Sequence, residues 1–548
     1  PLARAVLSSQ DFQSGNYAYY QLRQPSSGHL AGASAIWSYN NYGLFAQDDW
    51  QVNDQLSLQY GLRWDIPKVD QKPQLNNGFQ QTFGMANNHT IDGNSVLQPR
   101  VSFNYSFDTK RPMQLKGGAG LFMGATPAVW QSDPFTNNGL TVTTYKAYSP
   151  SQGGAFSADP YNQPTPPTNQ PAQTVDLLNK SFRQPTVLKA SLGFDSALPW
   201  WGMVASAEVS YLQDQDAIYY RNLNLGTPSV YGPDGRPIYY RLNSNGSVCT
   251  SRRCELANAN PSYGSIMLLS NTARGSATYF TLALSRPANN GFAWSASWTH
   301  GRSSSVNNGT SSIAYSNWKN NPSVNPNANI AYTANYNVRN RFSAWASWSH
   351  RFIGDYRTTV GAYLNVASGS PYSWIFGNDA NGDSRSNNDL VYVPSGPGDV
   401  EFTGNTSAQL QQQFFNYIKT QAGLRQYAGR DVPRNSGHLP WTHELDLRLT
   451  QEVPGLFKGN KGEVVVDVYN FLNMLNHNWG QYPSAGFPAA RSIANFAGID
   501  AANGKYIYDL SRYTDSHGNY APQMYSLLDS QTRPLSRWSV QVTLRYTF

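Results

Sequence analysis

The last twelve residues of the chain, 537–548, read R-W-S-V-Q-V-T-L-R-Y-T-F. Successive side chains of a strand point to opposite faces, so the odd-numbered positions form one wholly polar face. The other face is apolar and carries Trp538, Val540, Val542, Leu544, Tyr546 and Phe548. A strand of about ten residues with one lipid-compatible face and one wet face predicts an all-β fold, a transmembrane antiparallel β-barrel of the outer-membrane type.

The composition agrees with a barrel and excludes two other classes of protein. Charged residues make up 13% of the 548 residues and aromatic residues 14%, and the mean hydropathy is −0.52. No stretch reaches the roughly 18 consecutive apolar residues of a transmembrane helix. The net charge of +7 is dispersed, and basic pairs such as Arg252 and Arg253 are too short to indicate a nucleic-acid surface.

Alternating segments pair into six predicted hairpins, followed by the final strand. The hairpins are 42–52 with 56–65, 101–107 with 115–121, 188–194 with 203–211, 280–284 with 292–298, 342–348 with 358–364, and 445–449 with 464–468. Short connections alternate with long ones at about 66–97, 125–183, 214–275, 303–338, 370–440 and 472–535. Short periplasmic turns and long extracellular loops are the outer-membrane arrangement, which places the C-terminus in the periplasm.

Thirteen predicted strands form an incomplete barrel, because bacterial single-chain barrels normally have even strand numbers and an odd antiparallel sheet cannot close without a parallel seam. We therefore expect further strands upstream of Tyr42. Residues 1–40 show no sustained alternation and are predicted to be a loop leading into the barrel portion, 41–548. The first residues do not form a signal peptide, so we expect either a processed precursor or a fragment.

Several motifs together resemble TonB-dependent receptors, most closely the Oar-like branch. They are Y-G-L-F-A-Q-D-D-W-Q-V and L-S-L-Q-Y-G-L-R-W-D within 42–65, G-G-A-G-L-F at 117–122, S-G-S-P-Y at 368–372, D-A-N-G-D-S-R-S-N-N-D-L-V-Y-V-P at 379–394, P-R-N-S with E-L-D-L-R-L within 433–449, and V-D-V-Y-N-F-L-N at 466–473. The resemblance implies a barrel of about 22 strands or more, surrounded by outer-membrane lipid, with an N-terminal plug domain.

The resemblance also implies partners. The plug would connect the barrel to the inner-membrane TonB complex, which supplies energy for moving a large ligand, but neither a plug nor a TonB box is recognised in the sequence. The C-terminal strand, with Trp538, Tyr546 and Phe548, would be the signal read by the barrel-assembly machinery.

The sequence contains no complete catalytic motif of the classes considered below, and we expect no enzyme. His443 and Glu444 begin a metalloprotease-like motif but lack its second histidine, and on a strand the two side chains point to opposite faces. The eight histidines are scattered, and neither G-x-S-x-G nor a P-loop occurs.

One constellation has two chemical interpretations. Asp379, Asn381 and Asp383, together with Asp389, offer oxygen ligands in a glycine-containing loop, which suits calcium. The loop is not an EF-hand, because the twelfth position is Leu390. The alternative is a cluster of Asx-turns that organises the loop by local hydrogen bonds. No other cofactor is expected.

The two cysteines, Cys249 and Cys254, predict a small disulfide in an oxidising compartment, and no neighbouring histidine favours zinc. Helical spacing of Leu410, Phe414 and Ile418 predicts a helix after residues 405–407, either packed on its loop or in contact with ligand. The same alternatives, packing within the loops or stacking on a ligand, hold for Tyr219, Tyr220, Tyr239 and Tyr240.

These observations favour the C-terminal part of a TonB-dependent transporter in the bacterial outer membrane. A passive porin-like channel is the first alternative, distinguished by whether the upstream coding sequence encodes a plug. A structural or adhesive surface barrel is the second, and its lumen would be blocked by its own side chains.

Overall fold

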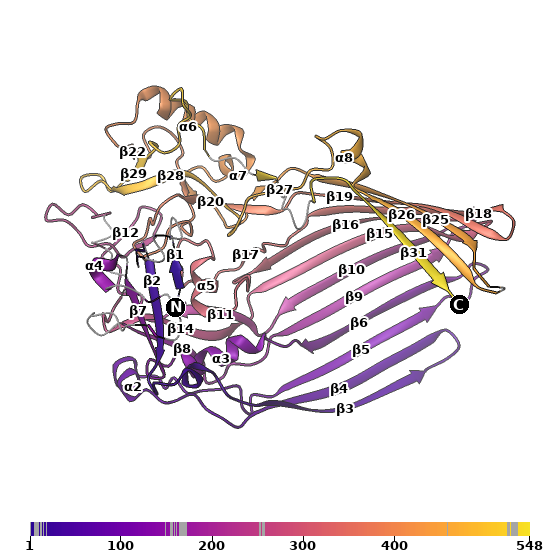
Figure 1. Ribbon diagram of the computed structural model, residues 1–548, viewed down its shortest axis with the longest axis horizontal. Coiled ribbons are helices and arrows are strands. Elements are labelled where there is room, and N and C mark those ends of the chain that lie inside the picture. The colour runs from indigo at the N-terminus through magenta and orange to yellow at the C-terminus, as the bar shows by residue number, and fades with distance from the viewer. Residues whose placement is uncertain are drawn as a thin grey trace.

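The computed structural model describes the chain except residues 1, 5–9, 11–13, 15, 18, 148, 154–156, 158, 160, 161, 164–171, 251–253, 255–257, 458, 523–525 and 528–534. Its main element is one large antiparallel sheet, which confirms the predicted fold class (Figure 1). No helix in the described parts of the chain is long and apolar enough to cross a membrane.

Thirteen strands follow one another along a single path through this sheet, the number predicted. They are β3 (Tyr39–Gln51), β4 (Leu56–Val69), β5 (Val96–Ser106), β6 (Met113–Met123), β9 (Thr186–Ala197), β10 (Val204–Asp214), β15 (Gly275–Asn289), β16 (Phe292–Ser305), β18 (Asn340–Ile353), β19 (Tyr356–Ala367), β25 (Thr442–Pro454), β26 (Lys461–Tyr469) and β31 (Ser539–Thr547). Short β17 (Tyr332–Thr333) adds to β16.

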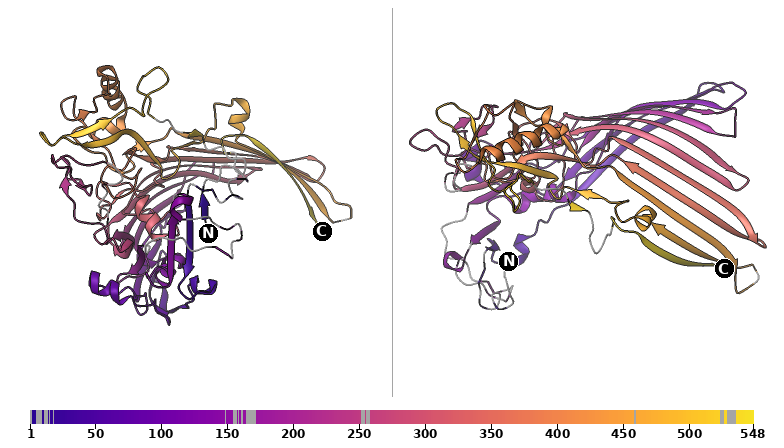
Figure 2. Two further views of the ribbon diagram at one scale, coloured as in Figure 1. Left: turned by 60° about the vertical axis from the view of Figure 1, so that its left-hand side comes forward. Right: turned by 90° about the horizontal axis from the view of Figure 1, so that it is seen from above.

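The sheet is curved and open (Figure 2). β3 and β31 are its two ends, and among the described residues no strand pairs with the outer edge of either. Short turns and the C-terminus lie at one end of the strands, and the long connections gather at the other (Figure 1).

The turn between β15 and β16 is shorter than the sequence pattern predicted. The sequence pattern put a turn across residues 286–291, whereas β15 continues to Asn289 and only Asn290 and Gly291 connect it to β16. Both residues have positive φ, 51° and 81°, as a two-residue hairpin turn of the Asn-Gly type requires. A Cβ on Gly291 would lie 2.2 Å from the carbonyl oxygen of Ser349, so glycine is needed there.

The two faces of the sheet differ in chemistry as predicted, and several carboxylates of the polar face are buried. Leu62 and Val542 on the apolar face are 45% and 62% exposed, while Asp65 and Asp467 on the polar face are 1% and 5% exposed. Register pairs like with like: Val542 lies opposite Val466, and Gln541 lies opposite Asp467. The apolar face is therefore the lipid side and the polar face the lumen side.

The long connections carry the remaining elements. Strands among them are β1 (Leu2–Arg4), β2 (Tyr19–Pro25), β7 (Val142–Ala147), β8 (Gln173–Leu178), β11 (Ala217–Asn222), β12 (Val230–Tyr231), β13 (Pro237–Ile238), β14 (Tyr263–Thr272), β20 (Pro371–Phe376), β21 (Tyr392–Val393), β22 (Glu401–Phe402), β23 (Arg430–Asp431), β24 (Gly437–His438), β27 (Pro483–Ser484), β28 (Ala490–Ile499), β29 (Tyr506–Asp509) and β30 (Ser526–Leu527). Helices are η1 (Leu30–Ala33), α2 (Asn77–Phe83), α3 (Ala128–Thr136), α4 (Pro150–Gly153), α5 (Ala314–Lys319), α6 (Ala408–Thr420), α7 (Ala422–Arg425) and α8 (Phe471–Leu475).

Residues 1–40 are not the plain loop that the sequence suggested. They contain β2, which pairs with β1 and with β7 from a connection more than a hundred residues later. Tyr20 and Leu22 of β2 are buried. Pairing with β7 stabilises β2, and the composition of residues 1–40 alone does not indicate this pairing.

Candidate functional site

The long connections fold together into a compact region with its own hydrophobic core at their end of the sheet (Figure 1). We call it the extracellular region, after the side of the membrane predicted for it from the sequence. A five-stranded sheet, β22-β29-β28-β20-β24, crosses it. Trp374 and Phe376 of β20 and Tyr506 and Tyr508 of β29 are at most 1% exposed. Binding surfaces on these connections therefore rest on a rigid support rather than on independent loops.

Helix α6 is the predicted amphipathic helix, and it belongs to this core. Ser407 caps it by accepting a hydrogen bond from the backbone N–H of Leu410 at 3.2 Å. Phe414 is fully buried, and its ring lies 5.9 Å from that of Phe402. Packing within the loops thus accounts for the apolar face of the helix.

Arg236 joins three of the long connections at one buried point. The side chain is fully buried, and its guanidinium lies 3.2 Å from Asp389, 3.4 Å from Asp431 and 3.6 Å from Asp234. The hydroxyl of Tyr506 donates to Asp234 at 2.5 Å, which brings in the last long connection. We call these five residues the arginine hub.

Electrostatics within the arginine hub are unbalanced, with three carboxyl groups around one guanidinium. Burial raises the pKa of Asp431 to about 8, and hydrogen bonding with Asp234 adds to the shift. Burial likewise raises the pKa of Asp389 to about 6, although Arg236 opposes the shift. Sequence patterns did not reveal the arginine hub, because Arg236 lies 153 residues from Asp389 and 195 residues from Asp431. The P-D-G-R turn at 233–236 was the only local signal.

The four residues considered for calcium do lie together. Asp379, Asn381 and Asp383 each accept a hydrogen bond from a backbone N–H two or three residues later, at 2.6, 2.9 and 2.9 Å. Asp389 accepts from the N–H of Ala380 at 2.9 Å. All four side chains are buried. These are the contacts of the Asx-turn interpretation.

Calcium binding at this loop stays a prediction. Burial and the negative charge of Asp389 raise the pKa of Asp383 to about 8, so this carboxyl group holds a proton at neutral pH in the absence of a cation. Within the described ranges, no group of three or more His, Cys, Asp or Glu side chains is arranged to hold a metal ion. Asp389 is also shared with the arginine hub, which competes for its oxygen atoms.

The two cysteines form a disulfide, with the Cα atoms of Cys249 and Cys254 5.8 Å apart. Cys254 packs against the hydrophobic core of the extracellular region, so the crosslink fixes the tip of its connection to that core.

The paired tyrosines of the same connection are all buried, between 2% and 8% exposed. Tyr220 accepts a hydrogen bond from Asn317 at 3.2 Å, and Tyr240 donates to the carbonyl oxygen of Asp379 at 3.0 Å. They stabilise the loops rather than face a ligand.

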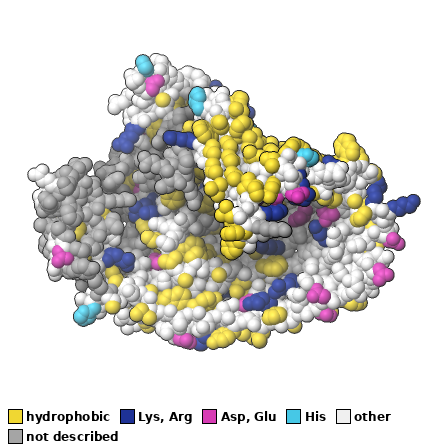
Figure 3. Space-filling model, turned by 45° about the vertical axis from the view of Figure 1, so that its right-hand side comes forward, with side chains coloured by type: hydrophobic (Ala, Val, Ile, Leu, Met, Phe, Trp, Pro, Cys, Tyr) yellow, Lys and Arg dark blue, Asp and Glu magenta, His cyan; other side chains and the backbone are white. Residues whose placement is uncertain are grey.

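The lumen face of the sheet is lined by ion pairs that cross from strand to strand. Arg448 of β25 binds Asp467 of β26 at 2.5 Å, and Lys116 of β6 binds Asp195 of β9 at 2.8 Å. Figure 3 shows charged side chains in a hollow beside a dense hydrophobic patch. These ion pairs make this face of the sheet polar.

The aromatic residues of the C-terminal strand are exposed on the surface of the sheet. Trp538, Tyr546 and Phe548 are 47%, 40% and 96% exposed. The hydroxyl of Tyr546 accepts hydrogen bonds from the N–H of Leu456 and from Asn460, both at 3.1 Å, which ties the last strand to the preceding turn.

Comparison with known proteins gives a family match over most of the chain. The model of a family described as outer membrane beta barrel domain matches residues 5–506. A comparison with curated proteins gives no match.

Solved structures with a similar arrangement include bacterial receptors and transporters at low sequence identity. The ferric enterobactin receptor PfeA of Pseudomonas aeruginosa is 15% identical with a TM-score of 0.37, over 79% of this chain and 40% of that one. The outer membrane transporter YddB of Escherichia coli is 9% identical with a TM-score of 0.39, over 93% and 54%. The copper transporter OprC is 11% identical with a TM-score of 0.37, over 92% and 48%. This chain spans about half the length of these proteins.

Proposed function

Because the chain belongs to the outer membrane beta barrel domain family, we propose that it forms the C-terminal wall and ligand-receiving loops of a TonB-dependent, Oar-like transporter. The observation that carries this proposal is the open thirteen-strand sheet with a polar lumen face, bearing a folded extracellular region at one end. A ligand would first meet the extracellular region and then pass along the hydrated face.

The open edges of β3 and β31 support a larger barrel. In hydrocarbon each unpaired backbone group costs several kcal/mol, so both edges require partner strands. We propose that additional strands close the sheet and that a plug domain fills the lumen. The plug would be pulled by the inner-membrane TonB complex, and the exposed C-terminal aromatic residues would be read by the barrel-assembly machinery.

Crosslinking in cells tests this function without knowledge of the ligand. The complete reading frame and residues 1–548 alone are expressed, and crosslinks to the periplasmic domain of TonB are measured beside sensitivity to vancomycin. The complete protein is expected to crosslink to TonB and to exclude vancomycin, whereas residues 1–548 alone should not crosslink. A complete protein that admits vancomycin in cells with and without TonB would be a passive channel and would overturn the proposal.

A further inference from the structure

A continuous row of side chains crosses the lipid face of the sheet obliquely. Each member lies directly opposite the next in the strand register. From β10 to β25 the row is Ala207, Leu282, Trp298, Phe342, Val366 and His443. Ala207 stands near a short turn, whereas His443 stands at the start of β25, beside a long connection. The row therefore rises toward the extracellular side, because barrel strands tilt by about 35–45°.

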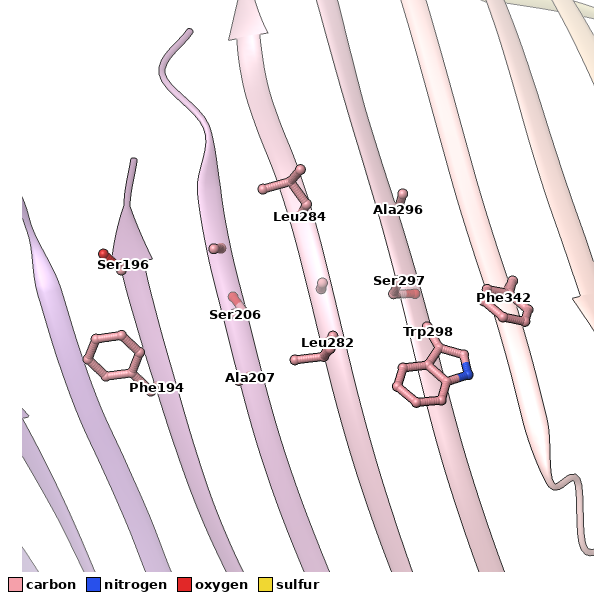
Figure 4. Close-up of a pocket in the computed structure, with 12 residues that line it drawn as sticks. Phe194, Ser196, Ser206, Ala207, Leu282, Leu284, Ala296, Ser297, Trp298 and Phe342 are labelled. Carbon is pink, nitrogen blue, oxygen red and sulfur yellow. The ribbon is translucent and has the colours of Figure 1, made fainter. Parts of the chain in front are cut away.

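The first four residues of this row line a groove about 460 Å³ in volume. The small side chains of Ala207 and Ala296 lie between larger ones, Leu282, Trp298 and Phe194 (Figure 4). The groove carries no Asp, Glu, Lys or Arg among its lining residues. An apolar hollow in a lipid-facing surface accepts an acyl chain with gain of van der Waals contact.

Aromatic contacts connect the groove to the extracellular end of β25. The rings of Trp298 and Phe342, which line the groove, lie 6.3 Å apart, and Trp441 stacks on Phe342 at 6.5 Å. Trp441 in turn lines a second cavity, of about 430 Å³. Three strand spacings of about 4.8 Å separate Trp298 from His443, a path of roughly 14 Å that an extended acyl chain can follow.

The second cavity has a different chemistry. Two indole rings, Trp441 and Trp479, are 43% and 52% exposed at its walls. Asn478, Gln481 and His443 supply hydrogen-bonding groups, and its lining residues include no Asp, Glu, Lys or Arg. Indole faces with neighbouring amides and an imidazole suit an uncharged sugar ring, which stacks by its C–H face and hydrogen-bonds by its hydroxyls.

We propose that the groove and the second cavity together bind one glycolipid of the outer leaflet, with its sugar between Trp441 and Trp479 and an acyl chain in the groove. The continuity of both cavities with the lipid-facing surface selects a membrane amphiphile over a free sugar. Their order along the oblique row matches the order of headgroup and chain in the outer leaflet, because tryptophans of barrels gather at the interface.

Retention of a neutral glycolipid tests the proposal. The protein, expressed from its complete reading frame, is extracted from outer membranes into detergent, exchanged into vesicles of phosphatidylethanolamine with monoglucosyl diacylglycerol, whose single sugar is uncharged, purified again, and analysed for the bound glycolipid by mass spectrometry. Trp441→Ala with Trp479→Ala should retain about tenfold less of this glycolipid, since two aromatic contacts of this kind contribute about that factor. Trp64→Ala is the matched control, because Trp64 is also an outer-face tryptophan and 43% exposed.

A second variant tests the groove separately. Ala207→Phe with Ala296→Phe fills the groove without adding polarity and should also lower retention of the monoglucosyl diacylglycerol, while heat-modifiable migration on gels shows that each variant is folded. Retention of the glycolipid that falls equally in Trp64→Ala, or that equals retention of phosphatidylethanolamine and is unchanged in both double variants, would overturn the proposal.

Discussion

Single positions on the barrel strands should respond to charge according to the face they occupy. Val542→Arg places a cation on the lipid side near the middle of β31 and should cost about 2–4 kcal/mol of folding free energy. Leu58→Arg places one on the same face near the start of β4, where the penalty is smaller because it falls toward the interface. Gln59→Arg and Gln541→Arg, one residue earlier or later, face the lumen and should be nearly neutral. Folding into liposomes, followed by denaturant titration, measures both pairs; equal destabilisation would mean that the faces are assigned wrongly.

Arg236 is the residue on which the extracellular region depends most. Arg236→Met would leave Asp234, Asp389 and Asp431 buried without their cation, which should destabilise the region by about 3–5 kcal/mol. Arg183→Met, at an exposed position, is the control. Hydrogen exchange of the backbone amides of β20 (371–376) and β28 (490–499) measures this loss of stability. Equal protection of these amides in both variants would contradict a stabilising role for the arginine hub.

The raised pKa of Asp431 predicts that the stability of the extracellular region depends on pH. Its pKa is about 8 in the folded protein and about 4 in an unfolded chain. Between these values the folded state holds a proton that the unfolded state has released, so stability falls as pH rises toward 8. Protection from proteolysis of the loops should therefore decrease from pH 5 to pH 8 in the wild type.

The matched variant for this pH effect is Asp431→Asn, which carries no ionisable group at that position. It should show a shallower decrease in protection over the same range. A profile as steep as that of the wild type would assign the pH dependence to another group, such as Asp383.

At the scale of elements, the loop from Asp379 to Asp389 offers a test of calcium. If the loop binds calcium, the ion should protect residues 379–394 from proteolysis, and Asp383→Ala should abolish that protection. Binding should strengthen as pH rises through about 8, because Asp383 must lose its proton first. Calorimetry without binding heat at millimolar calcium and pH 8.5 would leave the Asx-turns as the whole explanation.

Strands were predictable from the sequence and the extracellular region was not. Alternating hydrophobicity and short turns specify the hairpins locally. The Asn290-Gly291 pair also specifies a two-residue turn, which the alternation alone predicted to be longer. By contrast, β20 pairs in parallel with β28, and β8 with β14, across different long connections. Such pairings, like Arg236 and its carboxyl partners, depend on which loops meet in space, and no local period encodes them.

Helix α6 and the C-terminal strand were predicted from the sequence in part. Spacing of Leu410, Phe414 and Ile418 predicted the helix, but only the structure shows that its apolar face is covered by the loops. The alternation of residues 537–548 predicted which face of β31 is apolar, and the register with β26 agrees.

At the scale of the molecule, thirteen strands with two unpaired edges form a wall rather than a closed barrel. The parity of antiparallel pairing and the cost of bare edges in lipid are the physical reasons for our proposal that further strands complete the sheet. From β4 to β31 the wall places its mainly apolar residues on one face and its charged pairs on the other, whereas the edge strand β3 departs from this pattern with Phe45 opposite Arg63 and Asp48 opposite Tyr60.

That separation is the central claim, and cysteine accessibility tests it most directly. The two native cysteines are joined in a disulfide, so single cysteines introduced along β4, at residues 57–64, can be labelled against a low background in outer membranes. Positions 57, 59, 61 and 63 should react with a charged, water-soluble maleimide, whereas positions 58, 60, 62 and 64 should react only with a lipid-soluble one. Uniform reaction of all eight positions with the water-soluble reagent would show that no lipid covers this face, and would contradict the account.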